Sequence, residues 1–295
     1  MNAAQRGPEE QLAILPDGRR LAYLDLGAPD GPPMIHLHGA PSGKLEARFF
    51  DLDAAATRAG VRLLAVDRPG VGGSDPLPGR RLLDWPADVA GLADGLGIAT
   101  FAVLGYSMGA PSALACRERL EGRLTAVAIV SGLGPPDEPA LDTGRSPDVA
   151  RILRLARHRP LATTALLQVM RQGTRMPQRM LDSAARGAPP ADQQVADRPG
   201  APRQFAGFLA DALRQGTTGV RTDLHLAASP WGFVPSPRAA PVTIWHGSAD
   251  RNVPVAAASW LAERLPDAQL QLFPDEGHLS VLTRHAEQIL TALRP

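Results

Sequence analysis

Runs of apolar residues, each of strand length, alternate with helix-like stretches through the first half of the chain. The runs contain few polar residues, which is typical of strands covered on both faces. They span residues 33–39, 62–67, 100–105 and 124–132. The helix-like stretches between them each end at a glycine, the residue favoured just after a helix, and they span 44–60, 82–97 and 107–122. This alternation predicts a parallel sheet with helices on both sides.

Two shorter strand-like runs precede this pattern and two more follow it. Residues 12–27 hold a pair that meets at the turn-forming Pro16-Asp17-Gly18, which predicts an antiparallel hairpin. The late runs lie at 241–247 and 268–274, and a helix is expected at 279–293. The sequence therefore predicts an α/β fold with a mostly parallel eight-stranded sheet flanked by helices.

Residues 135–228 interrupt the alternation. This segment contains helical patterns and no long strand-like run. We therefore expect a helical cap, or lid, inserted into a core that is formed by residues 1–134 and 229–295. An insertion between strand ends would lie over a site at the edge of the sheet.

The composition is that of a globular protein acting on a small molecule. Over 295 residues the formal net charge is +1, which argues against a nucleic acid or a membrane surface bound through bulk charge. Cys116 is the only cysteine, which excludes an internal disulfide and a cysteine-based metal cluster. No signal-peptide-like or membrane-spanning segment is apparent. We therefore expect a cytoplasmic protein, either a monomer or a homodimer.

A Gly-x-Ser-x-Gly sequence, residues 105–109, lies between an apolar run and a helical pattern. In this context Gly105 and Gly109 allow the tight strand-to-helix turn that exposes a nucleophilic hydroxyl on Ser107. The N-terminus of the helix would then direct the Met108 N–H toward a developing oxyanion. The alternative is that Ser107 only caps the helix.

A nucleophilic serine needs a base and a carboxylate, which in this architecture follow it in the order Asp or Glu, then His. Asp250 follows the run 241–247, and His278 lies just beyond the run 268–274. Parallel strands bring their carboxyl ends to one edge of the sheet, so these two residues are expected near Ser107. Asp137, which follows the run 124–132, is an alternative carboxylate.

The loop after the run that begins at residue 33 is expected to supply a second oxyanion donor. It reads His38-Gly39-Ala40-Pro41, in which Gly39 permits a tight turn and Pro41 fixes the chain direction. The Ala40 N–H is the predicted donor. No histidine spacing typical of a metal site and no phosphate-binding loop is found, so neither a metal nor a cofactor is expected.

Five motifs in this order resemble those of the α/β-hydrolase family, and the resemblance covers essentially the whole chain. They are residues 38–43, 67–75, 105–109, 246–254 and 276–278. The resemblance implies a catalytic triad of Ser107, Asp250 and His278, and a cap domain at 135–228. The segment 214–233 is similar to members grouped with proline iminopeptidases and small-ester hydrolases.

The leading functional hypothesis is a serine hydrolase acting on an ester, or on an amide or thioester. Ser107 disfavours the epoxide hydrolase and haloalkane dehalogenase subfamilies, which resemblance says use aspartate there. Arginines such as Arg151 outnumber acids in the insertion, so an aminopeptidase is not favoured, and these arginines are interpreted as solvated helix faces. A lyase, cyclase or perhydrolase, and a ligand-binding relative, remain as alternatives.

Overall fold

One mixed sheet organises the chain in a computed structural model that describes residues 9–236, 240–265 and 267–295. Its strand order is β1-β2-β4-β3-β5-β6-β7-β8. Pairing is antiparallel between β1 and β2 and between β2 and β4, and parallel across the rest. The strands are β1 (Gln11–Ile14), β2 (Arg20–Gly27), β3 (Pro33–Leu37), β4 (Arg62–Val66), β5 (Phe101–Tyr106), β6 (Leu124–Val130), β7 (Val242–Gly247) and β8 (Gln269–Phe273). The mostly parallel eight-stranded sheet predicted from the sequence is confirmed.

Helices cover both faces of this sheet, and each face has its own apolar cluster. One cluster packs against α1, α2 and α12, and the other packs against α3, α4 and α11. Strand β5 is buried at every residue, as expected for a central strand. These helices are α1 (Glu46–Phe49), α2 (Leu52–Ala59), α3 (Trp85–Gly95), α4 (Ala110–Arg119), α11 (Val255–Arg264) and α12 (His278–Ala292).

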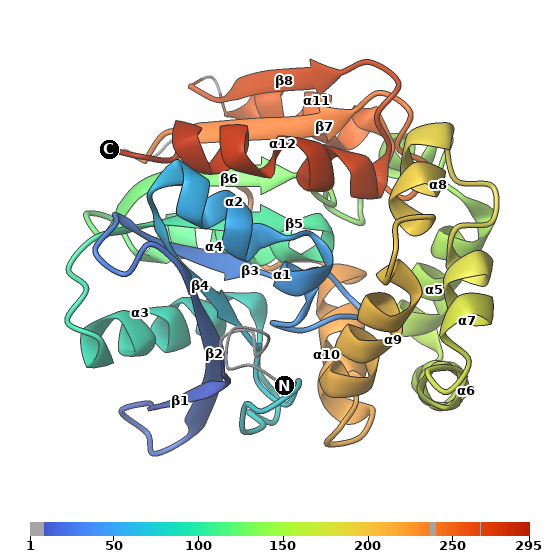
Figure 1. The fold of residues 1–295 in the computed structure, drawn as a ribbon, viewed down its shortest axis with the longest axis horizontal. Coiled ribbons are helices and arrows are strands. Elements are labelled where there is room, and N and C mark those ends of the chain that lie inside the picture. The colour runs from blue at the N-terminus through green and yellow to red at the C-terminus, as the bar shows by residue number, and fades with distance from the viewer. Residues whose placement is uncertain (1–8, 237–239, 266) are drawn as a thin grey trace.

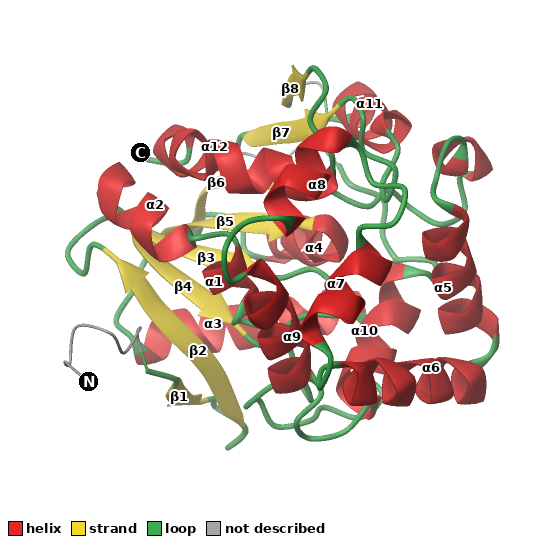
Figure 2. Cartoon of the chain, turned by 45° about the vertical axis from the view of Figure 1, so that its right-hand side comes forward, coloured by secondary structure: helices red, strands yellow, loops and turns green. Residues whose placement is uncertain are grey.

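Six further helices lie beyond the carboxyl ends of the strands, on one side of the molecule (Figures 1 and 2). We call them the cap helices: α5 (Pro147–His158), α6 (Pro160–Gly173), α7 (Pro177–Ala184), α8 (Pro190–Ala196), α9 (Ala201–Ala212) and α10 (Thr218–Ala227). Helix α8 packs beside α12, and α9 packs beside α1 and α7. The helical character predicted for the insertion is therefore observed. Residues 1–8, which were assigned to the core, lie outside the described residues.

The stretch 44–60, predicted as one helical segment, forms two short helices. Asp51 separates α1 from α2 and has a φ of 55°, which interrupts the helical hydrogen bonding. Aspartate tolerates this left-handed conformation better than most residues. Gly60, Gly97 and Gly122 have positive φ, as predicted for residues that end helices.

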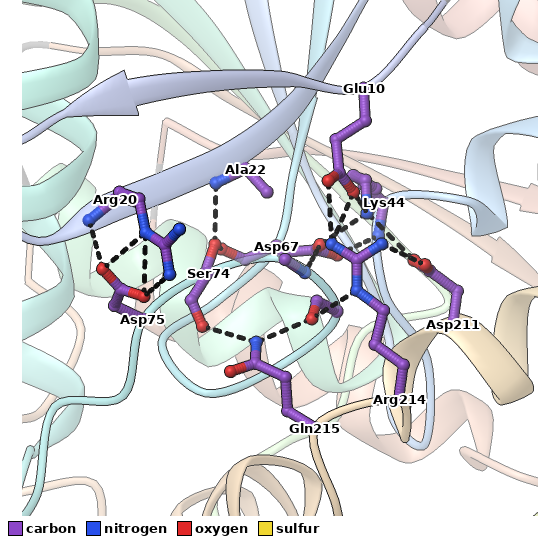
Figure 3. Close-up of polar contacts among 12 residues, drawn as sticks. Glu10, Arg20, Ala22, Lys44, Asp67, Ser74, Asp75, Asp211, Arg214 and Gln215 are labelled. Atoms are coloured by element: carbon purple, nitrogen blue, oxygen red, sulfur yellow. Dashed lines mark hydrogen bonds and ion pairs between the residues drawn. The ribbon is translucent and has the colours of Figure 1, made fainter.

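Lys44, the only lysine of the chain, ties the cap helices to the sheet. It is 1% exposed, and its Nζ lies 2.7 Å from Asp67 after β4 and 2.9 Å from Asp211 in α9. Glu10, just before β1, contributes a third carboxylate at 2.7 Å. Figure 3 shows these groups converging, with Arg214 bridging Glu10 to the neighbouring loop. No helix of the described chain is long and apolar enough to cross a membrane.

Candidate active site

The Gly-x-Ser-x-Gly sequence forms a tight turn between β5 and α4. Ser107 directly follows the last strand residue and has a φ of 54°, in the left-handed region. The glycines are required by close backbone packing: a Cβ on Gly109 would lie 2.0 Å from the Leu37 carbonyl oxygen, and one on Gly105 would lie 2.7 Å from the Gly109 carbonyl oxygen. The strained turn presents the Ser107 hydroxyl at the strand end.

The three predicted residues meet through their side chains. Ser107 Oγ lies 3.0 Å from His278 Nε2, and His278 Nδ1 lies 2.8 Å from Asp250 Oδ2. The other Asp250 oxygen accepts the backbone N–H groups of Asn252 and Val253, so the carboxylate is held in place. Ser107 makes no helix-capping hydrogen bond through its side chain. The alternative carboxylate, Asp137, instead pairs with Arg157 at the surface.

Burial and charge act in opposite directions on this histidine. Burial alone lowers the pKa of His278, but the charge and hydrogen bond of Asp250 outweigh it and raise the pKa above its usual value. Asp192 and Glu46 add to this effect. Burial raises the pKa of Asp250, but the neighbouring His278 outweighs burial and keeps that pKa below its usual range. An imidazole between a hydroxyl and a fixed carboxylate can accept the hydroxyl proton.

The loop after β3 is held in one orientation by Arg68. Its guanidinium donates to the His38 carbonyl at 2.6 Å and to the Gly39 carbonyl at 2.7 Å, and it pairs with Asp223 of α10 at 2.8 Å. In a trans peptide the N–H points away from the carbonyl, so this contact turns the Ala40 N–H away from Arg68. Ala40 lines the same cavity as Ser107 and Met108. The Ala40–Pro41 peptide bond is cis.

Sequence reasoning missed Glu46, a buried carboxylate beside this loop. It accepts the Gly39 N–H at 3.1 Å and lies 3.2 Å from His36 Nε2, and it lines the cavity near Ser107. A Cβ added to Gly39 would lie 3.2 Å from Glu46 Oε2 and 3.3 Å from Ser107 Cβ, so the glycine allows both to approach. Only its place within the stretch 44–60 was available from the sequence, and that pattern does not distinguish a buried acid from a solvated one.

Sequence reasoning also missed the groups that hold the backbone of His278. Asp192, in α8, accepts the N–H groups of His278 at 2.8 Å and of Leu279 and Ser280 at 2.9 Å. The His278 carbonyl accepts hydrogen bonds from Tyr106 at 3.2 Å and from the Ser131 hydroxyl at 3.3 Å. These contacts fix the first turn of α12 from the cap helices and from two strand ends.

The second half of the cap helices contacts the core through three acids. Asp192 binds the start of α12, Asp211 binds Lys44, and Asp223 binds Arg68 and Arg80. Of these acids, Asp192 and Asp223 are fully buried. Each acid therefore contacts an element next to the Ser107 hydroxyl or the loop that holds Ala40.

A cavity of about 600 Å³ opens between the strand ends and the cap helices. Ser107 and His278 lie in its wall, and apolar side chains from both sides line it, among them Phe49, Phe208, Met170, Met180 and Leu181. This volume lies within the range of small-molecule sites. Among the described residues no group of three or more His, Cys, Asp or Glu is placed to hold a metal ion.

Comparisons with known proteins bear on the family. A model of the alpha/beta hydrolase family matches residues 34–292. A 2-hydroxymuconate semialdehyde hydrolase of Pseudomonas putida is 29% identical over 302 residues, covering 98% of this chain and 94% of that protein. A proline iminopeptidase of Xylella fastidiosa is 36% identical over 105 residues, covering 34% of this chain and 32% of that protein. A thermophilic esterase from Thermogutta terrifontis has the same fold, with a TM-score of 0.66, 21% identity and coverage of 97% and 96%.

Proposed function

The chain belongs to the alpha/beta hydrolase family, and from that premise we propose that it is a serine hydrolase cleaving small carboxylic esters through an acyl-enzyme. The observation that carries the proposal is the continuous hydrogen-bonded path from Ser107 through His278 to Asp250. This geometry is what acyl transfer by a serine requires. The hydrolase named among its relatives and the esterase with the same fold support a hydrolytic role.

In the proposed reaction Ser107 Oγ attacks the ester carbonyl while His278 Nε2 takes the hydroxyl proton. The negative charge that forms on the carbonyl oxygen is stabilised by the N–H groups of Ala40 and Met108. His278 then gives its proton to the leaving alcohol, and the acyl group remains on Ser107. A water molecule, deprotonated by His278, attacks this acyl-enzyme and releases the acid.

The alternatives are less well supported by the contacts in the site. The carboxylates at the cavity, Glu46 and Asp192, already accept backbone N–H groups, so they offer little to the free amine of an aminopeptidase substrate. The proline iminopeptidase relative matches only about a third of the chain. Non-hydrolytic chemistry on the same residues, or simple ligand binding, would leave the hydroxyl of Ser107 without a lasting acyl group.

The direct test is ester turnover by a matched pair of serine variants. Ser107→Ala removes the proposed nucleophile, and Ser183→Ala removes a hydroxyl from the cap side of the same cavity. We expect kcat to fall on the order of 10⁵- to 10⁶-fold in the first and to change little in the second. Turnover of the same esters by folded Ser107→Ala at the wild-type rate would refute the proposal.

A further inference from the structure

We propose that the natural ester carries a negatively charged group, a carboxylate or a phosphate, at the end remote from its scissile bond, and that arginines at the cavity mouth bind this group. The inference rests on the proposed ester hydrolysis and adds the class of substrate. It begins from the distribution of charge along a chain whose net charge is only +1.

The first half of the cap helices is strongly basic. Residues 147–187, which cover α5 to α7, contain eight arginines and two acids, a formal charge of +6. The whole chain has 31 basic and 30 acidic residues, so the remainder has 23 basic and 28 acidic residues and a charge of −5. A near-neutral protein therefore concentrates positive charge in one short segment.

Most of this charge is not neutralised by neighbouring acids. Among the ion pairs of the described chain, only Arg157 of this group has a carboxylate partner, Asp137. The other seven are exposed, and they are Arg151, Arg154, Arg159, Arg171, Arg175, Arg179 and Arg186. Unpaired guanidinium groups around a cleft raise the local concentration of anions and speed their association.

Three of these arginines line the cavity that holds Ser107. They are Arg151 of α5, Arg179 of α7 and Arg186 just after α7, and Arg251 joins them from the loop after β7. Two carboxylates in the cavity wall, Glu46 and Asp192, are buried and accept backbone N–H groups. A third, Asp148 in the first turn of α5, is exposed. The mouth therefore carries four cations and one exposed acid.

The lining of the cavity is consistent with a substrate that has two different ends. Side chains such as Met170, Met180 and Phe208 give the wall an apolar surface for a hydrocarbon portion. The planar guanidinium groups at the mouth match the oxygens of a carboxylate or a phosphate, which they can bind with two parallel hydrogen bonds. The interpretation of the arginines as solvated helix faces applies to Arg154 and Arg159, which do not line the cavity, and not to Arg151.

The experiment compares matched esters of 4-nitrophenol in wild type: butanoate, which is neutral, the monoester of succinate, which ends in a carboxylate, and a phosphonate-terminated propanoate. We expect kcat/KM for at least one anionic ester to exceed that for the neutral ester roughly 10-fold at low salt, and the preference to shrink in 0.5 M NaCl because salt screens exposed charges. Whichever anionic ester is preferred distinguishes a carboxylate from a phosphate.

Two triple variants locate the effect. Arg151, Arg179 and Arg186 are changed together to Gln at the cavity mouth, and Arg154, Arg159 and Arg175 are changed together to Gln as a control of equal charge. We expect only the first to lose the preference, about 10-fold in kcat/KM, with neutral-ester turnover retained. An equal loss in both variants, or no preference in wild type, would overturn the inference while leaving ester hydrolysis in place. Absence of turnover for every ester, with no covalent labelling of Ser107, would overturn both.

Discussion

Asp192 and His278 are 86 residues apart in sequence, and the carboxylate of Asp192 accepts the backbone N–H of His278 at 2.8 Å. The same carboxylate accepts the next two N–H groups of α12. A residue of cap helix α8 thus satisfies the free N–H groups at the start of the helix that begins with the proposed base. Gly277 permits this contact, since a Cβ there would lie 2.5 Å from the Asp192 carboxylate.

Changing Asp192 to Asn should impair catalysis through the position and the proton affinity of His278. An amide offers one acceptor oxygen where the carboxylate serves three N–H groups, so the imidazole is less well placed and kcat falls about 10- to 100-fold. Loss of the negative charge also lowers the pKa of His278, so the acidic limb of kcat/KM should move to lower pH. Asp197→Asn, at the exposed end of the same helix, is the control. A purely structural role for Asp192 would leave the pH profile unmoved.

The pH dependence of the wild-type enzyme follows from the same residues. Catalysis needs neutral His278, and the negative charges around it raise its pKa, so activity should increase as the pH rises through a value above 6.5. Replacing Asp250 by Asn removes the main stabiliser of the imidazolium and should shift this limb downward while reducing kcat about 10⁴-fold. Asp137→Asn should change neither, because that carboxylate pairs with Arg157 instead. A rate profile that is flat between pH 5 and pH 8 in wild type would contradict the assignment of His278.

Much of this site could be predicted from sequence because its residues occupy fixed places relative to strands. Ser107, Asp250 and His278 each follow a parallel strand, and parallel strands end at one edge of a sheet. Glu46 and Asp192 could not be predicted in this way. Their roles depend on how helices pack in three dimensions, and an acid within a helical pattern reads the same whether it is buried or solvated. The division of 44–60 into two helices depends on the single left-handed residue Asp51.

Lys44 provides a test of how firmly the cap helices are held. Burial alone lowers the pKa of Lys44, but the attraction of Asp67 and its other carboxylate partners raises it, so the ammonium group stays charged. Replacing it by Met leaves Asp67 buried beside no cation and should cost roughly 3–5 kcal/mol in the free energy of unfolding. Denaturant titration measures this cost, and Arg154→Met at an exposed position of α5 is the control. A loss no larger than that of the control would show that the contact contributes little.

The same lysine offers a chemical readout, because it is the only one in the chain. An amine-reactive ester should modify it slowly in the native protein, where it is 1% exposed, and rapidly after unfolding. Peptide mass spectrometry separates this modification from that of the terminal amine. Rapid native-state modification, at the rate seen in denaturant, would mean that α9 separates readily from the sheet.

Arg68 should affect the transition state more than substrate binding. Its contact with the Gly39 carbonyl holds the peptide whose N–H is the proposed Ala40 donor. Arg68→Lys keeps the charge but cannot contact Asp223 and two carbonyls with one fork, so kcat should fall by up to about 10²-fold with little change in KM. Steady-state kinetics on a neutral ester, with thermal unfolding as a check on folding, measures both. A rise in KM with unchanged kcat would place Arg68 in substrate binding instead.

The central claim is that Ser107 is a nucleophile activated by His278. The most direct measurement is mass spectrometry of the intact protein and of its peptides after treatment with a fluorophosphonate, for wild type, Ser107→Ala and His278→Ala. We predict one adduct, located on Ser107, that is absent from Ser107→Ala and strongly reduced in His278→Ala. An adduct on another residue, or no adduct on folded wild-type protein, would contradict the account.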